Sequence, residues 1–400
     1  MTEPHLRRAL GVPLLVGYGV GVIVGAGIYV LVGEVVRAAG GYAPLSFLLA
    51  GMLAVLIAVC YCDLAGRFPE AAGAAAYVNE AFGSDAASRV VGLGIAAVVA
   101  SSTAAIARGS AGYAQVFVAL PAEAIAATLC IIATAVACLS VRQSVALAAV
   151  MSLIEVGGLL AVVAAGWREM PTLGKLAGGS AAPVGAGGVA AGVFLAFFAY
   201  IGFENMANMA EEARDTRRTM PRAMFLSLAV STVLYLMVVT VAVGAARGPG
   251  AIQGAAPLLA VGQSAGWYSP LAFAAVALVA VSNGVLIEII MLSRLFYGMA
   301  RRGLLPQRLA AIHPRTATPV NATFAAGLLV LALSVVLEFV ALAAAASAAT
   351  LLVFAAVAAA LWRLQSRGLP ARGFAAPRFV PPLAAALCVG LAAVQLLLGS

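Results

Sequence analysis

The chain has few charged residues, few histidines and no cysteine pattern typical of a metal or redox site. Charged residues make up 10% of its 400 residues, whereas soluble domains carry about 25%. Both histidines, His5 and His313, lie in basic loops. Cys60 and Cys62 have one residue between them and no second pair nearby, which excludes a zinc ribbon and a CxxC redox motif. We therefore expect no metal and no cofactor, and we interpret the cysteines as packing residues.

The sequence also lacks the motifs of common enzymes. It has no paired membrane aspartates, no histidine–glutamate zinc motif, no serine–histidine pair and no nucleotide-binding loop. The glycines at Gly25 and Gly27 follow no strand and precede no suitably spaced acid, so a dinucleotide loop is excluded. We expect the chain not to be an enzyme.

Apolar residues dominate instead. They make up 64% of the chain, and the mean hydropathy is +1.08. A membrane-spanning helix needs roughly 20 apolar residues, and no strand-like alternation is present. We predict an all-α polytopic membrane protein with about eleven spanning segments. They are 10–36, 43–65, 89–119, 122–140, 145–166, 187–209, 223–246, 268–298, 319–338, 340–362 and 380–398.

The net charge of +8 does not point to nucleic acid, because the basic residues lie in short loops between apolar runs. When alternate loops are compared, most of these residues fall on one side of the membrane. The exceptions are Arg37, Arg168, Lys175 and Arg247. Basic loops mark the cytoplasmic side, so we predict a cytoplasmic N-terminus in a multi-pass protein of the cytoplasmic (inner) membrane.

Two of the predicted segments are interrupted by glycine. The first contains Gly25-Ala-Gly27, and the sixth contains Gly202 followed by Glu204. These segments are five helices apart, so two halves built around them have opposite orientations in the membrane. Paired interrupted helices in inverted halves are typical of transporters whose binding site lies at the breaks.

The two breaks offer complementary chemistry. Free amides after Gly25 suit a carboxylate, because they lie at the positive end of a helix dipole. Carbonyls released near Phe198, Ala199 and Ile201 suit an ammonium group. Alternatively, Gly17, Gly21 and Gly25 form a small-residue packing stripe, and the Phe198 region is an aromatic core stripe with an incidental glycine.

The chain resembles the amino acid–polyamine–organocation transporters. The resemblance runs from about residue 10 to 325 and is carried by motifs in the expected order. They are Gly25-Ala-Gly-Ile-Tyr29, Phe68-Pro-Glu-Ala-Ala-Gly73 with Tyr77, Phe198–Glu204, Glu211–Arg214 with Pro221-Arg222, Ser293–Pro306, His313-Pro314 and Thr318–Asn321.

The resemblance implies an inverted five-plus-five helix fold with broken first and sixth helices. We therefore divide the chain into a cytoplasmic N-terminus (1–9), two five-helix repeats (10–170 and 185–363), and a cytoplasmic linker with a peripheral C-terminal helix (364–400). The resemblance also implies α-carboxylate binding at the first break and amine binding at the second. The candidate substrate-binding residues are Ile23, Gly25, Ala26, Gly27, Phe198, Ala199 and Ile201.

Three carboxylates lie within predicted spans, where ionisable groups are functional candidates. They are Glu155, Glu204 and Glu288. Glu155 matches a position where several proton-coupled members of this superfamily carry lysine. Because burial favours the neutral form of a carboxyl group, Glu155 is a candidate proton carrier, with a structural hydrogen-bonded role as the alternative. Glu204 is a gating or coupling candidate, and its alternative is a structural clamp.

Glu288 has no family role to carry over, and Arg108 could pair with one of the three carboxylates or extend outward.

We predict a secondary amino acid transporter that works by alternating access and is proton-coupled. The alternatives are an exchanger of cationic amino acids or polyamines and a non-transporting membrane sensor of amino acids. Its partners are then a small amine-containing substrate, protons and the lipid bilayer. If the three carboxylates are ionised, they favour a cationic substrate. The apolar wall formed by Phe198 and Ile201 slightly favours a neutral substrate instead.

Overall fold

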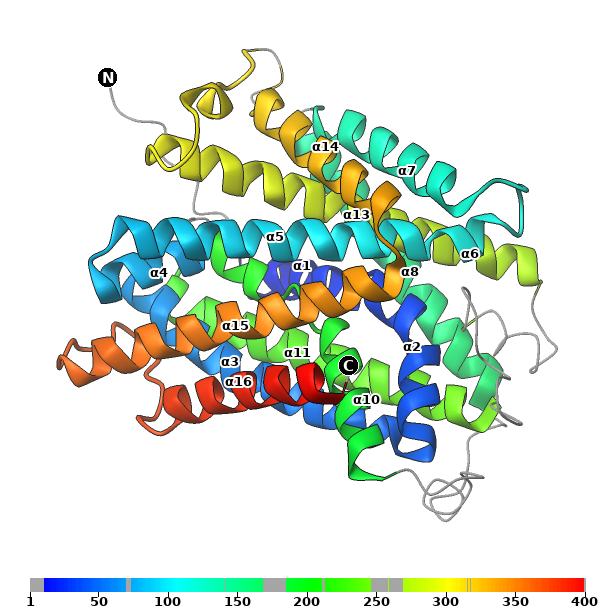
Figure 1. Cartoon of the computed structure of the whole chain (residues 1–400), viewed down its shortest axis with the longest axis horizontal. Coiled ribbons are helices and arrows are strands. Elements are labelled where there is room, and N and C mark those ends of the chain that lie inside the picture. The colour runs from blue at the N-terminus through cyan, green and yellow to red at the C-terminus, as the bar shows by residue number, and fades with distance from the viewer. Residues whose placement is uncertain are drawn as a thin grey trace.

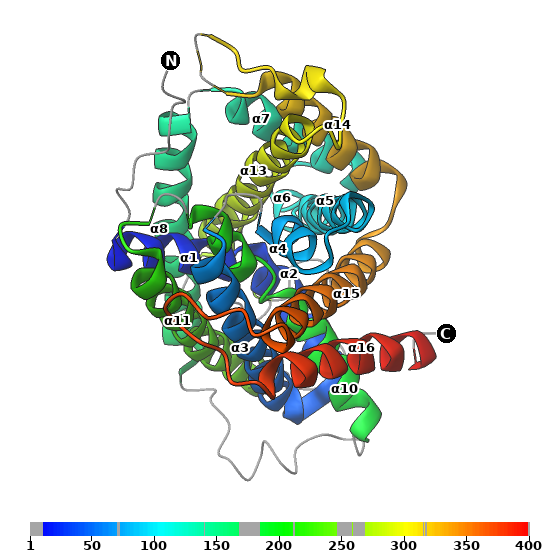
Figure 2. The same cartoon turned by 90° about the vertical axis from the view of Figure 1, so that its left-hand side faces the viewer.

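The structure is a computed structural model. It describes residues 11–69, 73–139, 141–167, 185–210, 213–245, 258, 269–314, 316 and 318–398. Within these residues the regular elements are helices, and no β-strand is present. Helix α5 (Asp85–Gly109) runs along the longest axis of the molecule between α13 (Pro270–Arg301) and α15 (Phe339–Ser366), and it packs against both (Figure 1 and Figure 2).

The first half of the chain follows the predicted segments closely. The first predicted segment is divided into α1 and α2, and the third into α5 and α6. The elements are α1 (Val12–Val24), α2 (Ala26–Ala39), η1 (Gly40–Tyr42), α3 (Ala43–Arg67), α4 (Gly73–Phe82), α5 (Asp85–Gly109), α6 (Ala111–Ala114), α7 (Ala122–Ala137) and α8 (Val141–Gly166).

The second half agrees in the same way. The sixth predicted segment is divided into α10 and η3, and the close junction near Glu338 separates α14 from α15 as expected. The elements are α10 (Ala186–Phe198), η3 (Phe203–Met209), α11 (Thr216–Ala245), α13 (Pro270–Arg301), η4 (Gln307–Ala310), α14 (Val320–Val336), α15 (Phe339–Ser366) and α16 (Val380–Leu398).

Six helical stretches in the described part of the chain are long and apolar enough to cross a membrane. They are Gly27–Arg67, Arg89–Ala114, Ala186–Ala207, Thr216–Ala245, Leu271–Arg301 and Ala345–Ser366. Shorter apolar helices accompany them. Large apolar side chains such as Leu153 and Val336 are 76% and 77% exposed, which suits a lipid-facing surface. The chain is thus a multi-pass membrane protein.

Two segments that the sequence analysis placed in loops are helical. Residues 73–82 form α4, which packs against α5 and α15. The basic segment before residue 223 is also helical from Thr216 onward, because α11 begins there. Glu211 and Glu212 lie outside the described residues.

A buried ion pair within α3 holds the segment between α15 and α16 through hydrogen bonds. Asp63 Oδ1 accepts from Arg67 Nε at 2.6 Å, and both side chains are almost fully buried. Arg67 also donates to the Leu369 carbonyl, and the Ala376 amide donates to Asp63 Oδ2 at 2.9 Å. Gln365 donates to the Ala376 carbonyl at 3.0 Å. We call this arrangement the Asp63 latch.

Candidate functional site

The first helix break lies at Gly25, as predicted. Helix α1 ends at Val24 and α2 begins at Ala26, so one residue separates two stretches of regular helix. The first amides of α2 have no partner within their own helix, because an α-helix leaves its first four N–H groups unpaired. The break therefore brings hydrogen-bond donors and the positive end of a helix dipole into the interior.

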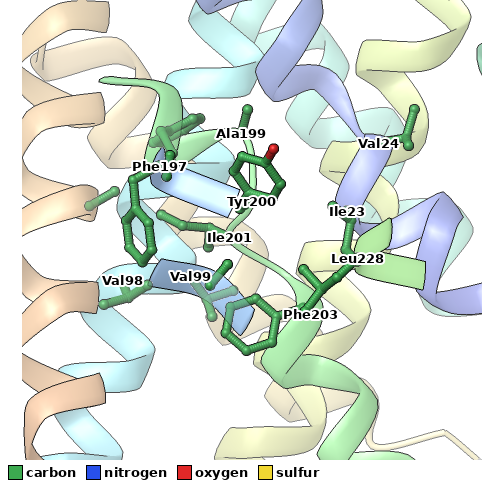
Figure 3. Packing of buried hydrophobic residues seen from close by; sticks show 14 of the residues in the cluster. Ile23, Val24, Val98, Val99, Phe197, Ala199, Tyr200, Ile201, Phe203 and Leu228 are labelled. Atoms are coloured by element: carbon green, nitrogen blue, oxygen red, sulfur yellow. The ribbon is translucent and has the colours of Figure 1, made fainter. Parts of the chain in front are cut away.

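The second break runs from Ala199 to Gly202, between α10 and η3. Gly202 has a φ of 121°, a backbone conformation that favours glycine. Its amide donates to Glu204 Oε2 at 2.8 Å. Figure 3 shows Tyr200 and Ile201 on this non-helical connection, near Ile23 of α1. The predicted interruption at Gly202 is thus present, and Glu204 stabilises its turn.

The two breaks touch each other through their backbones. A Cβ atom added to Gly27 would lie 2.8 Å from Ala199 Cα, and one added to Gly202 would lie 2.9 Å from the Val22 carbonyl oxygen. Real Cβ atoms do not approach backbone atoms so closely. The small residues at Gly27 and Gly202 therefore permit the two broken helices to lie in direct contact.

A tyrosine from α11 joins the same two breaks. The Tyr235 hydroxyl is within hydrogen-bonding distance of the Ala199 carbonyl, at 2.8 Å, and of the Ile23 carbonyl. Tyr235 is fully buried and packs edge-on against Tyr200. This residue was not among the sequence-based candidates, because nothing in its local sequence indicates that its partners are distant in the chain.

Residues from both breaks line one cavity, which we call the break cavity. It lies between α1, α2, α5, α10 and α13. Six of the seven candidate substrate-binding residues line it: Ile23, Gly25, Gly27, Phe198, Ala199 and Ile201. The side chain of Ala26, the seventh, lies outside the part of the chain that the structure describes. Glu288 and Ser102 also line this cavity.

The carbonyls predicted to bind an amine are already involved in hydrogen bonds. Phe198 O accepts from the Ile201 amide at 3.2 Å, and Ala199 O accepts from Tyr235. Each carbonyl oxygen has two lone pairs, so both can still accept from an ammonium group. The geometry therefore allows an ammonium group to bind here, and the Tyr235 hydroxyl is a competing hydrogen-bond donor to Ala199 O.

Glu155 is fully buried on α8, and its side chain contacts α13. Its Oε2 atom accepts from Asn283 Nδ2 at 3.3 Å, and the same amide donates to Ser152 at 3.0 Å. Within the described residues, Glu155 Oε1 and Asn283 Oδ1 have no hydrogen-bond partner. The Glu155 backbone carbonyl accepts from the Tyr29 hydroxyl at 2.6 Å, which connects this position to α2.

Glu204 lies at a second cavity, which we call the Glu204 cavity. Tyr61, Asn205 and Phe354 line the same space. The three membrane carboxylates therefore occupy three different environments: a pair with Asn283, the Glu204 cavity and the break cavity. Arg108 pairs with none of them, because it donates to Glu123 at 2.6 Å.

The small-residue stripe is present in part. Gly21 packs on Ser152, since an added Cβ atom would meet its hydroxyl oxygen at 2.5 Å. Gly17 has no neighbouring atom within 4 Å of such a Cβ atom. In the first segment, Gly21 therefore serves packing between helices, and Gly25 lies in the break.

Comparison with known proteins supports the transporter interpretation. A family model described as "Amino acid permease" matches residues 10–399. Three curated relatives are about equally similar. "Cationic amino acid transporter 4, vacuolar" of Arabidopsis thaliana is 31% identical, covering 89% of this chain and 63% of the relative. "Cationic amino acid transporter 2, vacuolar" of the same plant is 33% identical, covering 88% and 59%. "Cationic amino acid transporter 4" of Homo sapiens is 30% identical, covering 90% and 60%.

The chain thus spans about three fifths of the length of these relatives. The relatives are named as transporters, and the matching family is one of permeases rather than enzymes. The match to the family model covers almost the whole chain and includes both broken helices. This chain therefore belongs to the amino acid permease family, within the amino acid–polyamine–organocation superfamily.

Proposed function

We propose that this chain moves an amino acid across the cytoplasmic membrane by alternating access, with the substrate held in the break cavity. The observation that carries this proposal is the convergence of six candidate residues from two distant breaks on one cavity. The amides at the start of α2 bind the substrate carboxylate, and the carbonyls at Phe198, Ala199 and Ile201 bind its amine. Ile23 forms part of the wall.

The proposal includes the membrane arrangement predicted from the sequence. Eleven spans place the N-terminus in the cytoplasm, and the two five-helix repeats are inverted relative to each other. Helix α16 is peripheral. This arrangement is supported by the agreement of the predicted segments with the helices and by the distribution of basic residues between alternate loops. Cysteine labelling from each side of the membrane in inverted vesicles tests it.

We propose a cationic amino acid as the substrate. The three relatives described above are named as cationic amino acid transporters, although Phe198 and Ile201 alone slightly favour a neutral substrate. Exchange of cationic substrates is a second mode that the same cavity could serve. Preloading proteoliposomes with unlabelled lysine separates the modes, because an obligatory exchanger takes up label only when preloaded.

The central test is uptake of radiolabelled amino acids into proteoliposomes that contain the purified protein. We expect accumulation by the wild type. We expect at least a tenfold loss for Gly27→Ala, because the new Cβ atom would collide with Ala199. Gly17→Ala is the matched control, because its Cβ atom would meet open space. Binding without uptake by the wild type would instead favour a membrane sensor.

We further propose that transport is coupled to protons through Glu155 or Glu204. A buried carboxyl group whose Oε1 atom has no partner in the described structure is poorly suited to carry a charge, and a proton on Glu155 removes that charge. Glu155→Gln and Glu204→Gln should therefore be compared for uptake across an imposed pH gradient. We expect Glu155→Gln to remove the gradient dependence. If both variants respond to the gradient as the wild type does, the coupling assignment is wrong.

A further inference from the structure

Glu288 presents a buried acid to the break cavity. It lies on α13, is 9% exposed, and lines the cavity together with Ser102, Ile106 and Ile287. Two hydroxyl groups from α5 hold its carboxyl group. Ser102 Oγ lies 2.9 and 3.0 Å from its two oxygens, and Thr103 Oγ1 lies 2.7 Å from Oε2. The orientation of this acid is therefore fixed from the helix opposite.

No cation from the described part of the chain neutralises this group. The ion pairs of the described residues involve Glu34, Asp63 and Glu123, and Glu288 is in none of them. Arg108, which lies on the same helix as Ser102, is bound to Glu123. A buried carboxylate without a paired cation is costly. Hydroxyl donors lower that cost, but they leave the net charge in place.

The hydroxyl groups also leave acceptor sites unused. An ionised carboxylate has about four lone-pair sites and can bind a guanidinium group through two oxygens at once. The two hydroxyl groups have one hydrogen atom each, so they cannot fill all of these sites. The chain thus provides a fixed, partly satisfied acid beside a cavity whose other residues contribute mostly backbone and aliphatic groups.

The cavity supplies the remaining parts of a site for a long basic side chain. Its lining includes both breaks, which bind the main-chain groups in the proposed function. Ile106, Ile201 and Ile287 add apolar surface suited to the methylene groups of lysine or arginine. A charged group at Glu288 then meets the end of that side chain.

We propose that Glu288 is the specificity-determining residue of this transporter, and that it binds the cationic end of the substrate side chain. Ser102 and Thr103 are positioning residues that hold its carboxylate toward the cavity. The inference rests on the proposed function, because it assumes that the amine and carboxylate of the substrate lie at the two breaks. It assigns Glu288 to substrate selection rather than to proton coupling or gating.

The test compares lysine with norleucine, which has the same aliphatic chain but lacks the terminal ammonium group. Uptake of both is measured in proteoliposomes for the wild type and Glu288→Gln, with KM and kcat determined separately. We expect the substitution to raise KM for lysine about 10- to 100-fold, the value of a hydrogen bond to a charged group. KM for norleucine should stay the same or fall. Glu288→Asp should restore part of the preference for lysine.

The control is Glu34→Gln, which removes an acid that pairs with Arg37 and lines neither cavity, and it should leave the preference for lysine intact. An unchanged lysine KM in Glu288→Gln would overturn the assignment, as would equal losses for both substrates. If Glu288→Gln does not fold, Ser102→Ala takes its place and should raise the lysine KM selectively. If the wild type transports neither compound, the proposed function fails. Thermal-shift binding of lysine and norleucine to the purified protein then tests Glu288 separately.

Discussion

Two buried acids in this molecule have partners of different kinds. At the C-terminal end of α3, Asp63 is held by the Arg67 guanidinium group and by the Ala376 amide. Glu288, near the middle of α13, is held by the hydroxyl groups of Ser102 and Thr103. The chain provides its own cation for the first acid and none, among the described residues, for the second. Asp63 therefore stabilises the contact between α3 and the segment that joins α15 to α16. Glu288, in contrast, retains the capacity to bind a cation that the described chain does not provide.

The largest effect on stability is expected when the acid of the Asp63 latch is removed. Asp63→Asn leaves Arg67 as a buried charge without its partner, which typically costs about 3–5 kcal/mol. We expect a large drop in the unfolding temperature of the purified protein in detergent. Glu34→Gln is the control, because Glu34 pairs with Arg37 on a half-exposed surface and such pairs contribute below about 1 kcal/mol. Equal melting of the two variants would contradict the structural role of the latch.

A smaller effect is expected at the hydroxyl groups that hold Glu288. Ser102→Ala removes one donor to the carboxylate, and a hydrogen bond to a charged group contributes about 1.5–3 kcal/mol. The melting temperature should fall less than in Asp63→Asn. Added lysine should restore part of the loss, since a bound cation compensates for the missing donor. Ser101→Ala, at the half-buried neighbouring position, is the matched control. A variant insensitive to lysine would speak against a positioning role.

The smallest effect on stability is expected for Glu288→Gln. The amide retains the size of the side chain and removes a buried charge, so the free energy of unfolding should stay within about 1 kcal/mol of wild type or rise. Melting curves without substrate measure this change. The change in the free energy of unfolding should therefore differ most between Glu288→Gln and Asp63→Asn. A loss as large as that of Asp63→Asn would mean that Glu288 has a structural partner.

Much of the fold could be predicted because its signals are local. Long apolar runs marked the helices, and the interruptions at Gly25 and Gly202 were visible because glycine is costly inside a helix. The structure has its breaks at both. Helix α4 was missed because residues 73–82 are too short and too mixed to stand out from a loop. The inverted repeat and the number of spans remain predictions.

The site was predictable to the extent that backbone defines it. Six candidate residues meet in the break cavity because glycines and a motif mark the places where helices open. Side chains that act across the fold were not visible in the same way. Tyr235 is an ordinary residue of an apolar helix, and its partner Ile23 is 212 positions away. Similarly, the meeting of Glu288 with Ser102 spans 186 positions, so no local pattern could indicate it.

The Tyr235 hydroxyl group affects the protein when no substrate is bound. It has one hydrogen atom, yet it lies near carbonyl oxygens from both breaks. When a substrate amine takes one carbonyl, the hydroxyl can rotate to the other, and when the amine leaves, it can rotate back. Neither the loaded nor the unloaded protein then leaves both carbonyls bare in a dry interior. Under the proposed function, Tyr235 is then a resident substitute for the amine, and it lowers the free-energy cost of the empty carrier's return across the membrane.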